Sequence, residues 1–379
     1  MAATVLKIAM VGCGNISTYH LDAIGAASPQ RVDISCVIDP DQSRAEKLAS
    51  LVVEKLGRAE PPLVFHSLQD ACAADPDGKL FQACDVMVPS WETPDGDLHE
   101  VVALEVLKAR RHLLLEKPIA VTVAAAQRLI AAHAELCPEK VFMVAENAAY
   151  WPEIVQTQQL LQAGAIGDVL SARAKYWESA MGEWAVDYLP GSWRCDESKL
   201  PAASFTFDGA THWIRPLRMW LGEVEKVAGC CGVALGHMAG PSMSNHVFRF
   251  SSGKTAIFES MLAPSAISEQ PFFQIQGTKG EIVIDGFGGG ARLYTAEGDT
   301  VVTKEFCKEG WDAGYALEYA DFCAAVLDGQ PLAAGPESAV ADIAVSHAML
   351  KASEELAWVD VSAAATDGSS GDGSAAAAL

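Results

Sequence analysis

Along the first 147 residues, short apolar segments alternate with longer segments in which apolar residues recur at helical spacing. The apolar segments lie at Leu6–Gly12, Val32–Asp39, Cys84–Ser90, His112–Pro118 and Lys140–Asn147. The segments between them, such as QSRAEKLASLVVEKLG, predict helices. Apolar strands joined by helices indicate a parallel sheet with right-handed crossovers. The pattern therefore predicts an α/β domain with a doubly wound parallel sheet over residues 1–147.

The pattern changes after Asn147. A helical segment over residues 153–164 and a long strand over 168–179 come first, and alternating segments with short turns follow from Val224 to Glu305. Such segments predict antiparallel strands, and helical spacing returns after them. We therefore expect a second α/β domain over residues 148–360. The remaining residues, 361–379, are rich in Gly, Ser and Ala and predict a disordered tail.

Composition narrows the classes of function. The 27 basic and 49 acidic residues give a formal net charge of −22, which repels nucleic acid and anionic membranes. The chain opens on a strand-like segment instead of a signal peptide, and no apolar run is long enough to span a bilayer. Its ten cysteines form no CxxC pair and no zinc-type spacing. We expect a cytoplasmic protein with reduced thiols and no metal site.

A glycine pair follows the first predicted strand. In KIAMVGCGNIS, Gly12 and Gly14 lie between a strand and a helix, where a dinucleotide-binding loop requires them. The first glycine permits a tight turn, and the second lets the backbone approach a pyrophosphate at the helix N-terminus, beside Asn15 and Ile16. The third glycine of that motif is replaced by Ser17, a small residue. The alternative interpretation is a plain strand–helix turn.

Asp39 ends the second predicted strand, about 25 positions after the glycines. A carboxylate there can accept hydrogen bonds from both adenosine ribose hydroxyls and repels a 2′-phosphate. It therefore favours NAD over NADP, although Arg44 on the following helix would suit a phosphate. The alternative is that DPDQ is only a turn that caps the next helix.

Two further motifs carry acid–base chemistry. Glu116-Lys117-Pro118 lies where an apolar strand ends, at the edge where doubly wound sheets bind ligands. Lys117 can donate to a substrate hydroxyl or carbonyl beside the nicotinamide; the alternative is an ordinary surface lysine. Asp208 and His212 are four positions apart and would share one face of a helix. They make a candidate general base with its carboxylate, or else a helix cap and a core histidine.

The chain resembles the Gfo/Idh/MocA oxidoreductases, the family of glucose–fructose oxidoreductase and inositol dehydrogenase. The order of EKP and a downstream DxxxH is specific to this family, and the resemblance covers most of the chain. It is carried by the stretches KIAMVGCGNIS, CVIDPDQSRAEKLA, HEVVALEVLKARRHLLLEKPIAVT, LLQAGAIGDVLSARAKYW, GSWRCDESKLPAASFTFDGATHWIRPLRMWLGE and FFQIQGTKGEIVID. It implies a Rossmann domain and a second α/β domain whose large, open, mainly antiparallel sheet commonly forms an oligomer interface.

The resemblance also implies roles for residues. Lys117 would bind the reacting hydroxyl and help place the nicotinamide cofactor. His212 would take the hydroxyl proton, and Asp208 would orient or tune that base, in a catalytic site between the domains. Further residues would contact the cofactor: Pro89, His99 and Glu116. Others would contact substrate: Asn147, Tyr150 and Arg194.

Two departures from the family pattern put the substrate in doubt. Where many sugar-active members have another acidic residue after the histidine, this chain has Arg215 and Pro216, and Arg215 could meet an anionic substrate group. The loop from Pro89 to His99 is also lengthened.

These observations predict an NAD(P)-dependent oxidoreductase that transfers a hydride between the nicotinamide and a secondary hydroxyl or carbonyl. The substrate class is a sugar, a cyclic polyol or a related diol, and we expect a homodimer or homotetramer. The alternatives are an NAD-assisted glycosidase of the same family and a nucleotide-binding regulator without turnover.

Overall fold

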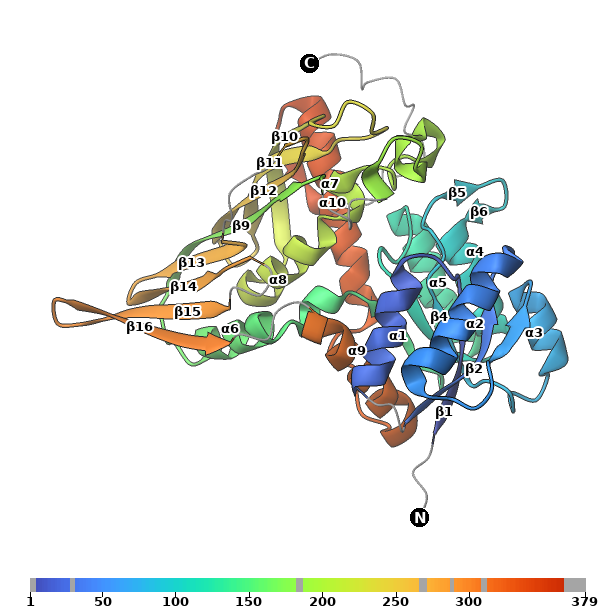
Figure 1. Cartoon of the computed structure of the whole chain (residues 1–379). Coiled ribbons are helices and arrows are strands. Elements are labelled where there is room, and N and C mark those ends of the chain that lie inside the picture. Colours follow the sequence, from blue (N-terminus) through green and yellow to red (C-terminus); the bar gives the residue numbers. More distant parts are fainter. Residues whose placement is uncertain are drawn as a thin grey trace. The chain divides into compact units, whose positions relative to one another are not determined.

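The computed structural model describes most of the chain and divides it into two compact units. The described residues are 5–27, 31–181, 187–265, 271–286, 290–307 and 312–364. The first unit comprises Met1–Val121, Ala125–Asn147 and Ala313–Val340, and the second comprises Thr122–Ala124, Ala148–Asp312 and Ala341–Leu379. Figure 1 labels the helices and strands of both units.

The first unit contains a six-stranded parallel sheet in the order β3-β2-β1-β4-β7-β8. Its strands are β1 (Leu6–Val11), β2 (Val32–Ile38), β3 (Leu63–Phe65), β4 (Ala83–Val86), β7 (His112–Glu116) and β8 (Phe142–Ala145). The accompanying helices are α1 (Ile16–Ala27), α2 (Gln42–Leu56), α3 (Leu68–Ala74), α4 (Leu98–Lys108), α5 (Val123–Leu136) and α9 (Asp312–Asp328). The order, with β1 in the middle, confirms the predicted doubly wound sheet.

Three short features of this unit escaped the sequence pattern. The edge strand β3 has only three residues, and two of them are exposed, so its apolar run is shorter than those that marked the other strands. Helix α3 follows it. The lengthened loop after β4 contains a small hairpin, β5 (Glu92–Thr93) and β6 (Gly96–Asp97).

Helix α9 groups with the first unit, whereas the sequence pattern predicted that all of residues 148–360 belong to the second domain. The reason lies in its buried residues. Tyr319 of α9 is 1% exposed and forms hydrogen bonds with Asp85 on β4 and His20 on α1. The chain thus returns to the first unit after the second sheet is nearly complete.

The second unit is built on a nine-stranded sheet in the order β16-β15-β14-β13-β9-β12-β11-β10-β17. Its strands are β9 (Val169–Ser179), β10 (Val224–Gly232), β11 (Met243–Phe250), β12 (Thr255–Ala263), β13 (Phe273–Gly277), β14 (Gly280–Ile284), β15 (Ala291–Glu297), β16 (Thr300–Cys307) and β17 (Val359–Asp360). Only the β9–β12 pair is parallel among the described strands of this sheet, so the sheet is mainly antiparallel, as predicted.

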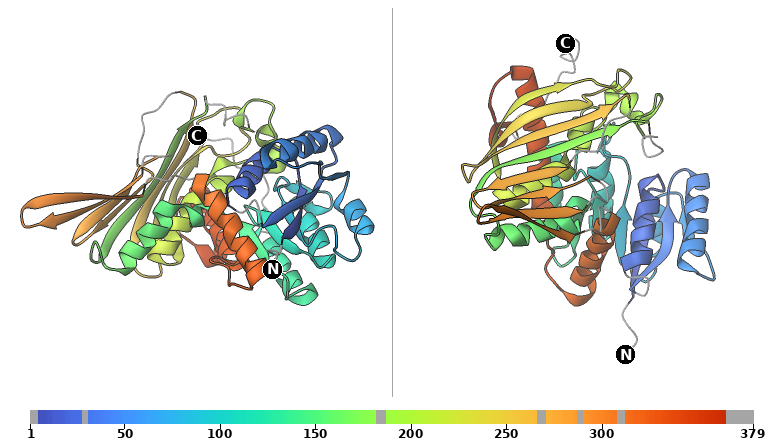
Figure 2. Two further views of the ribbon diagram at one scale, coloured as in Figure 1. Left: turned by 60° about the horizontal axis from the view of Figure 1, so that its bottom comes forward. Right: turned by 60° about the vertical axis from the view of Figure 1, so that its left-hand side comes forward.

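The helices of the second unit lie on one side of this sheet (Figure 2). They are η1 (Asn147–Tyr150), α6 (Pro152–Gln162), η3 (Trp193–Cys195), η4 (Glu197–Lys199), α7 (Phe205–Asp208), α8 (Thr211–Leu221), α10 (Pro336–Glu355) and α11 (Val361–Ala364). Along β11, buried and exposed residues alternate, which is the pattern of a strand with one packed face and one open face.

The chain end differs from the prediction at four residues. The disordered tail was expected from residue 361, but Val361–Ala364 forms α11, and both of its end residues are buried. The preceding strand β17 pairs with β10, so this segment is anchored by the sheet in a way that composition did not reveal. Residues 365–379 lie outside the described residues.

Candidate active site

The glycine loop between β1 and α1 requires glycine at its first position. Gly12 has a φ of +93°, and a Cβ there would lie 2.8 Å from the backbone carbon and oxygen of Met87. A Cβ on Gly14 would meet no atom within 4 Å. The backbone at Gly14 therefore faces open space at the N-terminus of a 12-residue helix, which fits the pyrophosphate of a dinucleotide.

Ser17 replaces the third glycine of the motif and stabilises the same loop. Its side chain is buried, and its hydroxyl donates to the Gly14 carbonyl oxygen at 2.6 Å. Asn15 lies between Gly14 and Ile16, the first residue of α1. The Ser17 hydroxyl thus ties the first turn of α1 to the end of the glycine loop.

Asp39 follows β2 and binds the glycine loop directly. Its carboxylate accepts the backbone N–H of Cys13 and that of Asp41, each at 2.8 Å. Each oxygen keeps a lone pair that suits a ribose hydroxyl. The capping alternative applies to a different residue, because the N-cap of α2 is Asp41. Arg44 is exposed and lies 3.4 Å from the Asp41 carboxylate.

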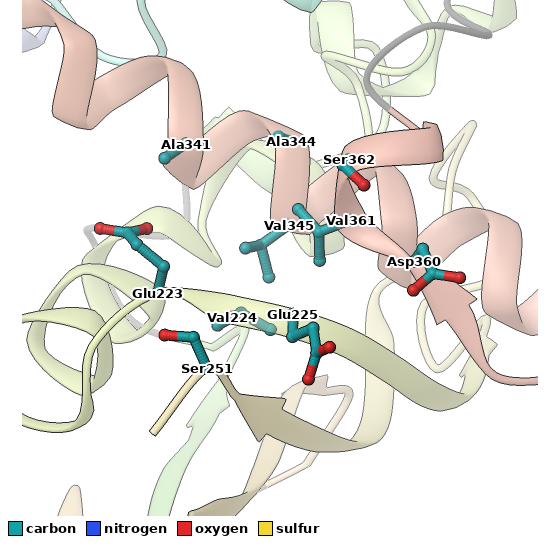
Figure 3. A pocket seen from close by; sticks show the side chains of 10 residues that line it. All are labelled: Glu223, Val224, Glu225, Ser251, Ala341, Ala344, Val345, Asp360, Val361 and Ser362. Atoms are coloured by element: carbon teal, nitrogen blue, oxygen red, sulfur yellow. The ribbon is translucent and has the colours of Figure 1, made fainter. Parts of the chain in front are cut away.

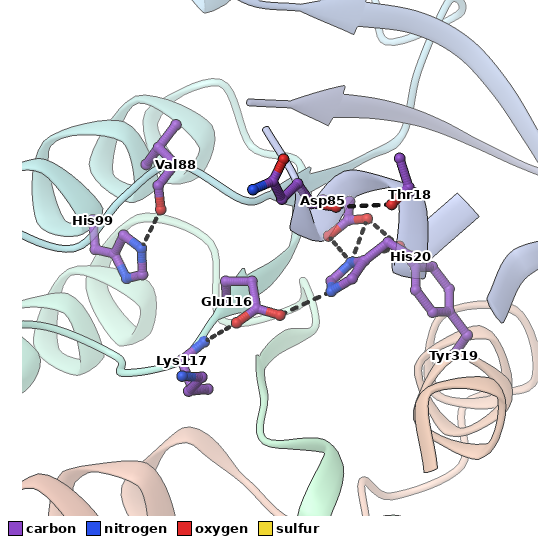
Figure 4. A network of polar contacts seen from close by, with 9 residues as sticks. Thr18, His20, Asp85, Val88, His99, Glu116, Lys117 and Tyr319 are labelled. Atoms are coloured by element: carbon purple, nitrogen blue, oxygen red, sulfur yellow. Dashed lines mark hydrogen bonds and ion pairs between the residues drawn. The ribbon is translucent and has the colours of Figure 1, made fainter. Parts of the chain in front are cut away.

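The Glu-Lys-Pro motif lies at the carboxyl end of β7. Glu116 is buried, and one carboxylate oxygen accepts the backbone N–H of Lys117 at 2.9 Å. The other oxygen lies 2.9 Å from Nε2 of His20 (Figure 4). Lys117 itself is half-buried, and its peptide bond to Pro118 is cis. The Glu116 carboxylate therefore links the His20 ring to the backbone N–H of Lys117.

His20 and its partners were not predicted from the sequence. The ring lies between Glu116 and Asp85, and Tyr319 donates its hydroxyl to Asp85 (Figure 4). One signal was present: Asp85 interrupts the apolar strand β4, and a carboxylate buried in a strand needs a partner. The identity of that partner could not be read from the spacing.

The two remaining predicted cofactor residues lie in or beside the lengthened loop. Pro89 is exposed. His99 is buried at the start of α4, and its two ring nitrogens lie 2.7 Å from the carbonyl oxygens of Val88 and Pro118. The ring thus connects the loop after β4 to Pro118, the residue after Lys117. Figure 4 shows the contact of the ring with Val88.

In the second unit, Asp208 and His212 lie on two short helices instead of one. Asp208 ends α7 and His212 is the second residue of α8, but the two residues that join these helices keep right-handed helical backbone angles. The N-cap of α8 is Ala210, so Asp208 is not the cap. Its carboxylate forms an ion pair with Arg194.

Aromatic side chains surround these polar residues. The Arg194 guanidinium lies 4.1 Å from the ring centroid of Trp193 and 4.5 Å from that of Tyr188. The half-buried His212 ring stacks on Trp151, with the centroids 6.5 Å apart and the planes inclined by 28°. Arg194 thus pairs with Asp208 and also packs against two aromatic rings.

Asn147 and Tyr150 lie at the two ends of η1. Both are buried. Neither the amide oxygen nor the amide nitrogen of Asn147 has a hydrogen-bond partner among the described residues. A buried amide is normally hydrogen-bonded, so this side chain is a candidate for contact with a ligand or water.

Arg215 does not meet the expectation of an anion-binding residue. It is 3% exposed, and its guanidinium pairs with Asp342 of α10, with nitrogen–oxygen distances of 2.5 and 2.8 Å. Arg218 pairs with the same carboxylate. The position that carries an acid in many sugar-active relatives therefore serves the packing of α8 against α10.

A surface cavity of about 390 Å³ lies elsewhere in the second unit. It is lined by residues of four segments (Figure 3): Glu223, Val224, Glu225, Ser251, Ala341, Ala344, Val345, Asp360, Val361 and Ser362. None of the predicted site residues lines it. Within the described ranges, no helix is long and apolar enough to cross a membrane, and no group of His, Cys, Asp and Glu side chains could hold a metal ion.

The parallel sheet and its glycine loop are the arrangement that dinucleotide-binding proteins share. Two family models match the chain: "Oxidoreductase family, NAD-binding Rossmann fold" over residues 6–145, and "GFO/IDH/MocA C-terminal domain" over residues 154–283. The chain belongs to the Gfo/Idh/MocA oxidoreductase family.

Among curated proteins, the chain is similar to an inositol 2-dehydrogenase of Corynebacterium glutamicum, with 26% identity over 178 residues that cover 47% of each protein. It is also similar to a levoglucosan dehydrogenase of Pseudarthrobacter phenanthrenivorans, with 27% identity over 53% of this chain and 56% of that protein. A glycosyl hydrolase family 109 protein of Akkermansia muciniphila is 26% identical over 50% of this chain and 37% of that protein. The chain spans about half of these relatives or less.

Among solved structures, an oxidoreductase of Thermotoga maritima superposes with a TM-score of 0.78 at 23% identity, over 95% of this chain and 99% of that one. A levoglucosan dehydrogenase in complex with NADH superposes with a TM-score of 0.78 at 21% identity, over 94% and 99%. At such identities the superpositions establish the shared fold of both units.

Proposed function

We propose that this protein is an NAD-dependent oxidoreductase that transfers a hydride between the nicotinamide and a secondary hydroxyl or carbonyl. Its substrate is a sugar, a cyclic polyol or a related diol. The observation that carries the proposal is the glycine loop. Gly12 must be glycine, Gly14 faces open space, and the Asp39 carboxylate is fixed beside them by the Cys13 N–H.

The preference for NAD rests on charge. The Asp39 carboxylate, 7% exposed and tied to the loop backbone, would repel a 2′-phosphate and accept bonds from ribose hydroxyls. Arg44, the residue that would favour NADP, is paired with Asp41. Gly12, Gly14, Asn15 and Ile16 hold the pyrophosphate in this proposal.

When bound, NAD supplies the hydride acceptor, and the chain supplies binding and acid–base groups. Lys117 donates a hydrogen bond to the reacting oxygen. His212 takes the hydroxyl proton when a substrate is oxidised and returns it when one is reduced. The ion pair with Arg194 fixes the carboxylate of Asp208, which lies four positions before His212 in the sequence. Asn147 and Tyr150 offer further polar contacts to substrate.

The first experiment is a titration of the protein with NADH and with NADPH, followed by energy transfer from tryptophan to the nicotinamide. We expect tight NADH binding and at least about tenfold weaker NADPH binding, and Asp39→Asn should narrow the gap. A protein that binds neither nucleotide contradicts the proposal.

The second experiment separates catalysis from binding. Lys117→Ala should lower kcat by about 100-fold or more, on the scale of general acid–base effects, and should leave NADH binding largely intact. Lys108→Ala, which removes an exposed lysine of α4 in the same unit, is the matched control and should retain wild-type turnover. Turnover by Lys117→Ala at the wild-type rate would remove Lys117 from the site.

A second candidate function is suggested by the similarity to glycosyl hydrolase family 109 proteins. In an NAD-assisted glycosidase the nucleotide would be reduced and reoxidised within each cycle. A product assay distinguishes the dehydrogenase from the NAD-assisted glycosidase. A dehydrogenase accumulates NADH in step with product, whereas such a glycosidase releases sugar with no net NADH.

A homo-oligomer is also part of the proposal. Val247 and Ile257 are cross-strand neighbours on the open face of the nine-stranded sheet and are 40% and 42% exposed. A second copy of the sheet would cover them. Light scattering after gel filtration measures the oligomer size. All ten cysteines are free thiols, which supports a location in the reducing cytoplasm.

A further inference from the structure

His20 is fully buried in the first unit, and its ring bridges two carboxylates. Its Nδ1 lies 3.0 and 3.1 Å from the two Asp85 carboxylate oxygens, and its Nε2 lies 2.9 Å from the Glu116 oxygen (Figure 4). These contacts connect α1, which begins at the glycine loop, to β4 and to the residue before Lys117. A role for this bridge in turnover rests on the proposed function.

The hydrogen-bond inventory assigns the charge of this ring. An ionised carboxylate only accepts hydrogen bonds, so each ring nitrogen must carry a proton in order to bond its partner. Both carboxylates also accept elsewhere: Asp85 takes the Tyr319 hydroxyl, and Glu116 takes the Lys117 backbone N–H. With both carboxylates ionised, His20 is an imidazolium between two anions.

The surroundings favour this charge state. Burial by itself lowers the pKa of His20, but the charges and hydrogen bonds of Asp85 and Glu116 outweigh it and raise the pKa well above 6.5. Burial also raises the pKa of Glu318 well above its ordinary value. The titratable groups around the ring are Asp85 on β4, Glu116 on β7, Glu146 after β8, and Tyr315, Glu318 and Tyr319 on α9.

The chain of contacts ends at a residue of the proposed active site. One Glu116 oxygen is held by His20, so the other is fixed where it accepts the Lys117 N–H. Without the imidazolium, the buried Glu116 carboxylate would lose a hydrogen-bond partner, which favours a change in its side-chain orientation. We propose that His20 is a positioning residue whose two N–H groups orient Glu116 and thereby fix the backbone at Lys117.

The charge is tested first, on the unmodified protein. Nitrogen-15 NMR of protein labelled in its histidines, with His20→Gln to assign the signal, should show both ring N–H groups of His20 between pH 7 and 8. A single ring N–H in that range would overturn the proposal. This measurement needs no substrate and no active variant.

The positioning role is tested by kinetics. His20→Gln should lower kcat by about 10- to 100-fold, the scale of small misplacements in an active site, while the Kd for NADH changes less than about threefold. His133→Gln is the matched control, because His133 is a half-buried histidine of the same unit whose Nε2 lies 2.7 Å from the Lys140 carbonyl oxygen. It should retain wild-type kcat.

A second variant changes the carboxylate that bonds to Nε2 of His20. Glu116→Gln removes the charge that His20 holds, and it should give the same pattern even if His20→Gln does not fold. The double variant should be no worse than the more damaged single variant, because the two act as one unit. Wild-type kcat in either single variant overturns the proposal, as does an NADH Kd that weakens in step with kcat. Failure of the proposed function is seen separately, as a wild-type protein that neither binds NADH nor turns over.

Discussion

Two buried histidines, one in each unit, have nearly the same exposure and opposite chemistry. His20 is 0% exposed and His246 is 2% exposed. His20 lies between two carboxylates, whereas His246 donates from Nε2 to the Met349 carbonyl oxygen at 3.0 Å, and its Nδ1 has no partner among the described residues. Burial lowers the pKa of His246 to about 4, while its partners raise that of His20. Partners, not burial, decide the charge.

The largest difference in unfolding free energy between the two histidines should appear when each ring is replaced by leucine. His20→Leu leaves two buried carboxylates without their cation and should lower the free energy of unfolding by about 3–5 kcal/mol. His246→Leu removes one neutral hydrogen bond and should cost about 1–2 kcal/mol. Urea denaturation at pH 7, followed by circular dichroism, measures both. Equal losses would show that His20 is not charged.

The dependence of stability on pH above 7 tests the raised pKa of His20. Because its folded-state pKa is raised, its stabilising contribution is complete below the ordinary value of 6.5 and is lost as pH rises through the folded-state pKa. The difference in unfolding free energy between wild type and His20→Leu should therefore shrink as pH is raised from 7 to 10. A difference that stays constant across this range would contradict a raised pKa for His20.

The dependence of stability on pH below 7 tests the lowered pKa of His246. The unfolded chain takes up a proton near 6.5, but the folded protein resists it until about pH 4. Stability is thus lost as pH falls between these values, by roughly 3 kcal/mol at about 1.4 kcal/mol per unit. His246→Gln should show a shallower loss than wild type in the same titration. Parallel profiles would mean that His246 is protonated in the folded state.

The smallest expected effect belongs to Tyr319. Tyr319→Phe removes the hydroxyl that donates to Asp85 but keeps the bonds of His20 to both carboxylates, and should cost about 1 kcal/mol. Tyr294→Phe, at a half-buried tyrosine of β15, is the control and should change stability by less than about 0.5 kcal/mol. A loss as large as that of His20→Leu would assign the central role to the hydroxyl.

The candidate site was predictable where it depends on local sequence. Gly12, Asp39 and Lys117 each directly follow a strand, and Gly14 comes two residues after Gly12. Their places at the carboxyl edge of a parallel sheet therefore follow from the hydrophobic pattern. The spacing of these residues relative to the strands carries the information. The same holds for the doubly wound sheet itself.

The contacts that fix those residues were not predictable. Tyr319 is 299 positions from His20, and Arg215 is 127 positions from Asp342. The anion-binding interpretation of Arg215 failed because Asp342 belongs to a helix that the local pattern could only describe as helical. Likewise, nothing near Asp208 indicated that Arg194, rather than a helix terminus, would engage its carboxylate.

The sequence by itself determined the elements, the glycine loop and the residues that end each strand, because backbone geometry and apolar periodicity act over a few neighbouring residues. The tertiary structure alone decided the charges of buried groups and the partners of the site residues. A buried ionisable side chain takes its state from whatever charge the fold brings within hydrogen-bond distance. His20 and His246 differ for that reason, because the fold places carboxylates beside one ring and a backbone carbonyl oxygen beside the other.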